Sequence, residues 1–239
     1  MTAKIPTLVL SKPTGIGNGQ IMPKPYKIRR YYMPTDVSPH CIYNDCWVII
    51  FGEVYDITPL LQQTNNKLCE PLIKAAGTDI SHWFDINTRD PKVWVDPKLN
   101  IKCYYTPQGR FLHVPPAVPD CTWVKDYDTP WWKERKYVIG TLTSKVRKIR
   151  IFNMLTKHEN VIEVCTEDTL NEILDRFLDL NQHAASYTWK RLGKPLDMDK
   201  TLAENNIPDE TQEMINLGID EDDYIPAIHL YFNDDLTVA

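Results

Sequence analysis

The feature that most constrains the fold is an unbroken β-rich stretch in the first quarter of the chain. It reads Asp45-Cys46-Trp47-Val48-Ile49-Ile50-Phe51-Gly52-Glu53-Val54-Tyr55-Asp56-Ile57-Thr58. Two runs rich in β-formers, 46–51 and 54–57, flank Gly52-Glu53, and a two-residue turn that starts with Gly is typical of a type II′ hairpin. Asp56 and Thr58 can then hydrogen-bond the backbone as the chain leaves the sheet. The sequence therefore predicts a hairpin with its turn at residues 52–53.

A helix junction follows the hairpin. Residues 70–76 place a proline early and are followed by Gly77, as expected of a short helix, and Thr78 or Asp79 can cap a turn over 80–84. The order of strand, hairpin and junction resembles the cytochrome b5-like domain, whose members carry D-x-W-V, G-x-V-Y-D-x-T and A-G-x-D motifs in this order. The resemblance implies an α+β domain built around a haem site.

The same resemblance locates the two positions where the haem ligands are expected. The first histidine of the family falls nine residues after the hairpin tyrosine, and counting from Tyr55 reaches Thr64. The second follows Phe84 within a few residues, but residues 85–90 contain no histidine. Threonine is not an axial ligand of haem iron, whereas His, Cys thiolate, Met and Tyr are. We therefore expect no haem.

Two other residues keep haem open as an alternative. His82 lies between Ser81 and Trp83, before the family's second-ligand position, where a packed or hydrogen-bonded histidine is the commoner outcome. Cys69 lies close to the expected first-ligand turn, and a thiolate can hold haem iron. These are the weak ligand candidates that the sequence offers.

Length and charge define the rest of the chain. A chain of 239 residues, with 43% hydrophobic and 10% aromatic residues, predicts two domains with real cores. The net charge of −5 argues against a nucleic-acid partner. The six cysteines form no C-x-x-C pair, so we expect no metal site. No secretory signal or membrane-length apolar run is present, so we expect a cytosolic chain with reduced thiols and no membrane contact.

Residues 1–30 predict an extended arm. Prolines and glycines prevent a continuous helix or a central strand there. Its charged residues are all basic: Lys4, Lys12, Lys24, Lys27, Arg29 and Arg30. The arm is either a solvated tail or a segment that orders on an acidic partner.

We assign residues 31–113 to the cytochrome b5-like domain and residues 114–144 to a connecting belt rich in proline and tryptophan. Because tryptophan needs surface to bury and proline stiffens the path, the belt should pack across the domains; a peptide-binding aromatic groove is the alternative. Residues 145–239 predict strands over 146–155, 161–165, 186–190 and 225–232. A helix near 170–178, with Thr166 or Asp168 as its cap, shows one apolar face. This order, with Leu192-Gly193-Lys194-Pro195-Leu196, resembles the ubiquitin-like β-grasp.

No arrangement of catalytic type is present: the histidines show no H-E-x-x-H spacing and no G-x-S-x-G occurs. Residues 80–85, 109–116 and 183–190 extend the resemblance to a family of cytochrome b5 domain-containing proteins of the ciliary radial spoke. That likeness implies a structural or adaptor subunit of the motile-cilium axoneme, not an enzyme, which contacts neighbouring radial spoke proteins, other axonemal proteins or tubulin. A haem-binding redox sensor is the alternative. Relatives place a tyrosine and a histidine at the positions of Thr64 and Trp94.

Overall fold

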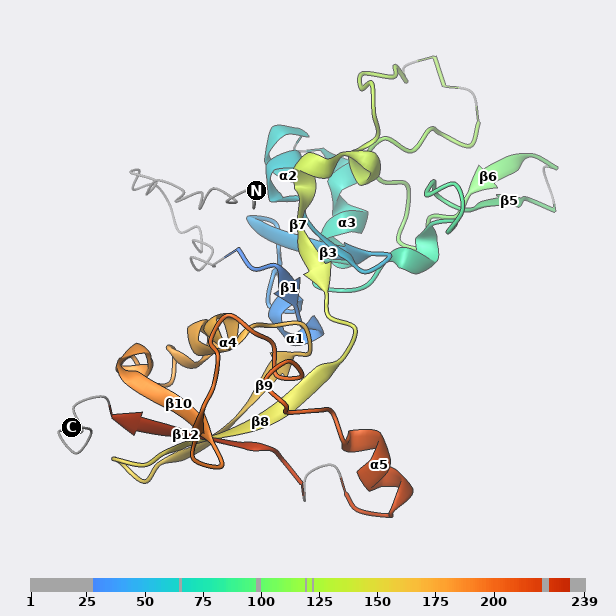
Figure 1. Cartoon of the computed structure of the whole chain (residues 1–239). Helices are drawn as coiled ribbons and strands as arrows, with labels where there is room; N and C mark the ends of the chain where they lie inside the picture. Colours follow the sequence, from blue (N-terminus) through green and yellow to red (C-terminus); the bar gives the residue numbers. More distant parts are fainter. Residues whose placement is uncertain are drawn as a thin grey trace, which may run out of the picture.

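The computed structural model describes residues 28–64, 66–97, 100–118, 120–121, 123–220 and 224–232. Within them the chain forms two five-stranded sheets and a separate two-stranded hairpin (Figure 1). Of the predicted basic arm, only residues 28–30 fall inside the described ranges. The six cysteines are all free thiols.

The first sheet has the strand order β1-β7-β4-β3-β2. Its strands are β1 (Tyr31–Tyr32), β2 (Cys41–Ile42), β3 (Asp45–Ile50), β4 (Glu53–Asp56) and β7 (Val138–Leu142). Its helices and 3₁₀ turns are α1 (Pro34–Val37), α2 (Thr58–Thr64), η1 (Lys67–Cys69), α3 (Glu70–Lys74) and η2 (Ser81–Trp83). The separate hairpin consists of β5 (Val93–Val95) and β6 (Lys102–Tyr104).

The predicted hairpin is present, but its turn lies one residue earlier than predicted. Ile50 pairs with Glu53, so the turn residues are Phe51 and Gly52. Their φ angles of +49° and +77° make it a type I′ turn, whose twist suits two antiparallel strands. Phe51 adopts this unusual φ while its N–H donates to Ser81 Oγ at 2.7 Å. Glu53 therefore belongs to the strand and not to the turn.

The helix junction matches the prediction at its glycine. Gly77 follows α3 with a φ of +75°, and a Cβ built there would lie 2.7 Å from the backbone oxygen of Ser38. The N-cap position of η2 is Ile80, not the predicted Thr78 or Asp79, although Asp79 Oδ1 accepts the Ser81 N–H at 2.8 Å. Gly77 is thus required both by backbone conformation and by close packing.

The segment predicted as a connecting belt, residues 114–144, forms part of the first folded unit. Trp131 and Trp132, in η3 (Trp131–Lys133), are buried in the core of the first sheet, followed by η4 (Arg135–Tyr137). Strand β7 then pairs with β4 and runs parallel to β1. The first folded unit therefore extends to Leu142, because the belt's tryptophans need this core to bury their rings.

The second sheet has the strand order β11-β10-β12-β8-β9. Its elements are β8 (Val146–Asn153), β9 (Glu159–Cys165), α4 (Leu170–Phe177), η5 (Ala184–Ser186), β10 (Tyr187–Arg191), β11 (Lys194–Pro195), α5 (Thr211–Asn216) and β12 (Ala227–Phe232). The last strand runs parallel to the first, and the other neighbours are antiparallel. The four predicted strands are present with shifted ends, whereas α5 is not indicated by the sequence pattern.

Helix α4 presents the predicted apolar face but uses a different cap. Leu170, Ile173 and Phe177 are buried against the second sheet. The cap is Thr169, whose Oγ1 accepts the Glu172 N–H while the Glu172 carboxylate accepts the Thr169 N–H, a capping box. The predicted candidates Thr166 and Asp168 are not the cap, because the chain enters the helix one residue after Asp168.

Asp168 instead takes part in an ion-pair network that joins the two units. Arg176 on α4 donates from Nε to Asp168 at 2.7 Å and from Nη1 to Asp36 on α1 at 2.8 Å. Its Nη2 also donates to the backbone oxygen of Tyr31 at 3.1 Å. The side chain of Arg176 is only 7% exposed and that of Asp168 only 2% exposed. One guanidinium thus connects the second unit to two elements of the first, and Figure 1 shows α1 facing α4.

We predict that Arg176→Ala lowers the free energy of unfolding by about 3 kcal/mol, because it leaves the Asp168 carboxylate buried without its partner. Urea unfolding followed by tryptophan fluorescence measures this loss. Arg135→Ala is the matched control, since Arg135 is 88% exposed and reaches Glu53 only at 3.9 Å. Equal effects of the two substitutions would contradict a structural role of the buried network.

Candidate functional site

The two positions expected to hold haem ligands carry side chains with other uses. Thr64 ends α2, and its hydroxyl donates to the backbone oxygen of Leu60 at 3.0 Å. Trp94 lies on β5 with 47% of its surface exposed, and an indole nitrogen is a donor only. Neither threonine nor tryptophan is a recognised axial ligand of haem iron.

The two weak ligand candidates lie in different surroundings. Cys69 is 2% exposed within the core of the first sheet. His82 is exposed on η2, with its ring edge against Trp83 at 6.1 Å between centroids. The structure does not bring them together, and neither lines the cavity of about 890 Å³ beside β5 and β6.

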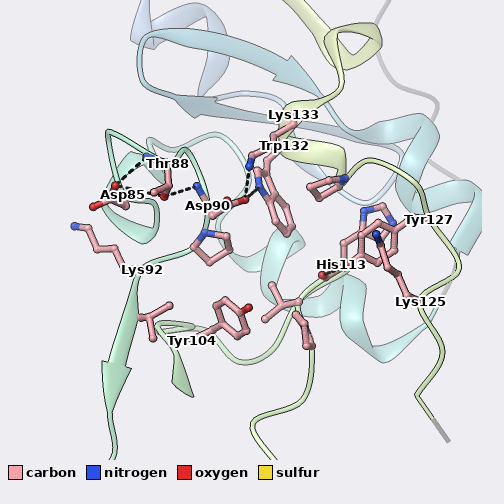
Figure 2. A pocket seen from close by; sticks show the side chains of 15 residues that line it. Asp85, Thr88, Asp90, Lys92, Tyr104, His113, Lys125, Tyr127, Trp132 and Lys133 are labelled. Carbon is pink, nitrogen blue, oxygen red and sulfur yellow. Dashed lines mark hydrogen bonds and ion pairs between the residues drawn. The ribbon is translucent and has the colours of Figure 1, made fainter. Parts of the chain in front are cut away.

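That cavity, of about 890 Å³, lies between the segment before β5, strand β6 and the belt (Figure 2). Its aromatic wall is formed by Tyr104, His113, Tyr127 and Trp132. Three prolines, Pro91, Pro115 and Pro130, also line it. Its charged lining residues are Asp85, Asp90, Lys92, Lys125 and Lys133. An apolar body with a few polar groups at its edge is typical of a ligand-binding cavity.

His113 is held in this wall by three contacts. Its ring stacks on Tyr127 with centroids 3.9 Å apart, and the Tyr127 hydroxyl donates to the His113 backbone oxygen at 2.5 Å. The backbone N–H of Trp131 donates to His113 Nδ1 at 3.0 Å. His113 also has a φ of +67°, which is uncommon for a residue other than glycine and clusters at functional sites.

These contacts determine the protonation of His113. Burial lowers its pKa below the ordinary histidine value, although Asp126 and Glu134 act in the opposite direction. Because Nδ1 accepts a backbone N–H, the proton of the neutral ring is on Nε2. His113 therefore offers a hydrogen-bond donor and not a free lone pair at Nε2.

Tyr104 and Tyr127 are the cavity residues of a haem-ligand type, and the Tyr127 hydroxyl donates to the His113 backbone oxygen. The other positions named above do not fit a haem. The two family positions, the two weak candidates and the cavity histidine provide no axial donor that faces a common space. An axial ligand must present a lone pair or a thiolate to the iron, and the only imidazole in the cavity wall uses its lone pair on Trp131. No haem chemistry is therefore assigned to this domain.

Part of the charge in the cavity is neutralised internally. Asp90 accepts from Lys133 Nζ at 2.7 Å and from Trp132 Nε1 at 3.3 Å. Asp85 accepts the backbone N–H groups of Asn87 and Thr88, which lowers its pKa below the ordinary value. Figure 2 shows Lys92 and Lys125 on opposite sides of the cavity. The arrangement can therefore bind an apolar or aromatic group that carries negative charge, but it assembles no nucleophile with a base.

His113 and Tyr127 are functional-site residues that the sequence reasoning missed. The available signal was a histidine directly before Val114-Pro115-Pro116 in a segment rich in aromatic residues. The peptide-groove alternative for the belt stays a prediction, and the pairing of residues 113 and 131 could not be predicted without the fold. Among the described residues, no three His, Cys, Asp or Glu side chains gather as metal ligands, and no helix is long and apolar enough to cross a bilayer.

We predict that burial of neutral His113 makes the protein less stable as the pH falls. Above about pH 6.5 the histidine is neutral in both states, whereas below it the unfolded chain takes up a proton that the native ring resists. In urea unfolding between pH 7.5 and 5, His113→Asn should remove part of this decline, because asparagine tolerates positive φ and does not titrate. The exposed His183→Asn serves as the control, and identical slopes for wild type and His113→Asn would contradict the argument.

Comparison with known proteins places the chain in a family. Residues 33–142 match the model of the cytochrome b5-like heme/steroid binding domain. Cytochrome b5 domain-containing protein 1 of Xenopus laevis is 55% identical over 87% of this chain and 96% of its own length. The human and mouse proteins of the same name are 49% and 47% identical, over 93% and 92% of their lengths. The chain therefore belongs to the family of cytochrome b5 domain-containing protein 1.

Proposed function

We propose that the protein is a non-catalytic adaptor subunit of the motile-cilium axoneme, in the radial spoke, where it supports ciliary beating. The observation that carries the proposal is the state of the two expected haem positions, where Thr64 is bonded to its own helix and Trp94 is exposed. A domain that keeps its fold but not its iron ligands is retained for its surfaces. The resemblance to radial spoke proteins supplies the location.

The second unit supports the same role if it is a ubiquitin-like domain, as we infer from its topology. Its first two strands form a hairpin, one helix follows, and the last strand lies parallel to the first in the middle of the sheet. The packing of α4 against one face of that sheet supports the same inference. The recognition role that we propose for this unit rests on analogy of fold, and a fold alone does not assign a function.

The partners that fit this role are neighbouring radial spoke proteins, other axonemal proteins or tubulin. The chain offers a rigid pair of units, because Arg176 links α4 to α1 and to Asp168. It also offers the basic arm of residues 1–30, whose six positive charges favour an acidic surface. Neither nucleic acid nor a membrane is part of the proposal.

We predict that the tagged chain concentrates in the axoneme of motile cilia and resists extraction at low salt. Deletion of residues 1–28 should release it at lower salt without unfolding either unit, because screening weakens the arm's attraction to an acidic surface. Extraction of isolated axonemes over a salt series measures this, with circular dichroism as the folding control. A diffuse cytosolic signal would refute the axonemal location, and an unchanged salt profile would refute the role of the arm.

A haem-based redox sensor in the radial spoke is the competing function, and the heme/steroid description of the matching domain model favours it. We predict that the purified protein shows no specific haem spectrum with added haemin, because the family positions supply no ligand. A sharp Soret band that survives desalting and disappears in His82→Ala, Cys69→Ala or His113→Ala would support the sensor. Thr64→Ala, which removes no possible ligand, is the matched control.

A further inference from the structure

The cavity wall continues onto an exposed apolar strand face. In the register of the β5–β6 hairpin, Val93 lies opposite Tyr104 and Val95 opposite Lys102, so these four side chains share one face of the hairpin. We call this set the hairpin face. Val93 and Tyr104 also line the cavity. Val93 and Val95 are 55% and 52% exposed, and Figure 1 shows the hairpin extending away from the first sheet.

Such a hairpin is suited to contact with another chain. Two strands alone gain little stability, and the described structure pairs β5 and β6 only with each other. Exposed valines on a narrow ribbon leave apolar surface next to unpaired strand edges, which is the arrangement that receives an added strand. The hairpin face therefore extends the cavity into a surface longer than a small ligand needs.

The charge of this surface selects the occupant. The cavity lining has three lysines against two carboxylates, and Lys102 of the hairpin face adds another cation. Of the two carboxylates, Asp90 is held by Lys133 and Trp132, and Asp85 by the amides of its own turn. Within the described structure, no hydrogen bond or ion pair is recorded for the ammonium groups of Lys92 and Lys125, beyond the position of Lys125 over the Tyr127 ring at 5.4 Å.

We propose that the cavity and the hairpin face together bind an extended acidic segment of a partner protein. An aromatic or prolyl side chain of that segment enters between Tyr104 and Trp132, and its carboxylates meet Lys92 and Lys125. His113 Nε2–H donates to an acceptor of the bound segment. This site deepens the adaptor role proposed above and rests on it.

The apolar anchor should dominate affinity, and the lysines should set the salt dependence. Ion pairs at an exposed rim add little each and are screened by salt, whereas a buried aromatic anchor is the usual hot spot of an interface. Loss of the aromatic wall at Tyr104 should therefore weaken binding about 30-fold. Charge reversal at Lys125 should weaken it about 10-fold at low salt and have little effect at high salt.

The test uses the full chain and fluorescent seven-residue peptides with four glutamates, in which the central residue is Tyr, Phe, Trp, Pro or Ala. Fluorescence anisotropy measures binding at low and high salt. We expect the aromatic and prolyl peptides to bind better than the alanine peptide. Glutamine versions should bind more weakly at low salt and about equally at high salt. The variants are Tyr104→Ala, Lys125→Glu and Lys92→Glu, each checked for folding by circular dichroism. The two lysine changes keep the test valid if Tyr104→Ala is unfolded.

Lys74→Glu is the matched control, because Lys74 is an exposed lysine of α3 outside the cavity lining and the substitution changes the net charge equally. Equal weakening by Lys74→Glu and Lys125→Glu would overturn the proposal in favour of unspecific attraction. Absence of binding by every peptide would overturn it too, as would tight binding of a fatty-acid or steroid probe alone. If peptides fail while the tagged chain still enters the axoneme, the adaptor function stands and only this site is refuted.

Discussion

Burial of Trp131 and Trp132 in the first core is the interaction on which the arrangement of the chain depends. Their rings lie 5.7 Å apart at right angles and pack against Phe111, which lies just before the belt. Truncation of such a buried ring costs about 3–5 kcal/mol, a large part of the stability of a small domain. The belt must therefore return to the sheet, and this return delivers β7 to the gap between β1 and β4.

The same packing creates the candidate site. Because the backbone N–H of Trp131 donates to His113 Nδ1, the two ends of the belt are joined where they pass the core. The loop between them carries Tyr127 back onto the His113 ring. Trp132 meanwhile reaches Asp90, which fixes the segment before β5 as the opposite wall. The cavity is thus a consequence of how two tryptophans are buried.

The second unit is positioned by a short connection and by one cation. Leu142 ends β7 and Val146 begins β8, and between them Thr143 and Ser144 bind the Glu167 carboxylate at 2.6 and 2.9 Å. Arg176 then crosses to Asp36 and Tyr31 of the first unit. A connection held at both ends gives the two units one orientation. In the adaptor role proposed above, this orientation would keep partners on the two units at a set distance.

Local patterns were sufficient to predict the elements, but not the contacts that make the site. The runs of β-forming residues in β3 and β4 and the spacing of Leu170, Ile173 and Phe177 follow from burial, so those elements could be predicted. The turn at Phe51 and Gly52 was misplaced because nothing local reveals that Ser81 supports a positive φ at Phe51. Thr169 was missed as a cap because Asp168, an equally good capping residue, is taken by Arg176. The belt could be recognised as rigid, but its partner could not be identified.

Trp94 occupies one of the two expected haem-ligand positions and also lies on the exposed β5–β6 hairpin. Here it is 47% exposed on a two-stranded hairpin whose opposite face holds Val93 and Val95. On the other face, Trp94 lies opposite Cys103, which is buried. A two-stranded hairpin with exposed apolar side chains on both faces is marginally stable by itself. A partner that covers these side chains would stabilise it. The exposed apolar side chains of β5 suit the partner segment proposed above.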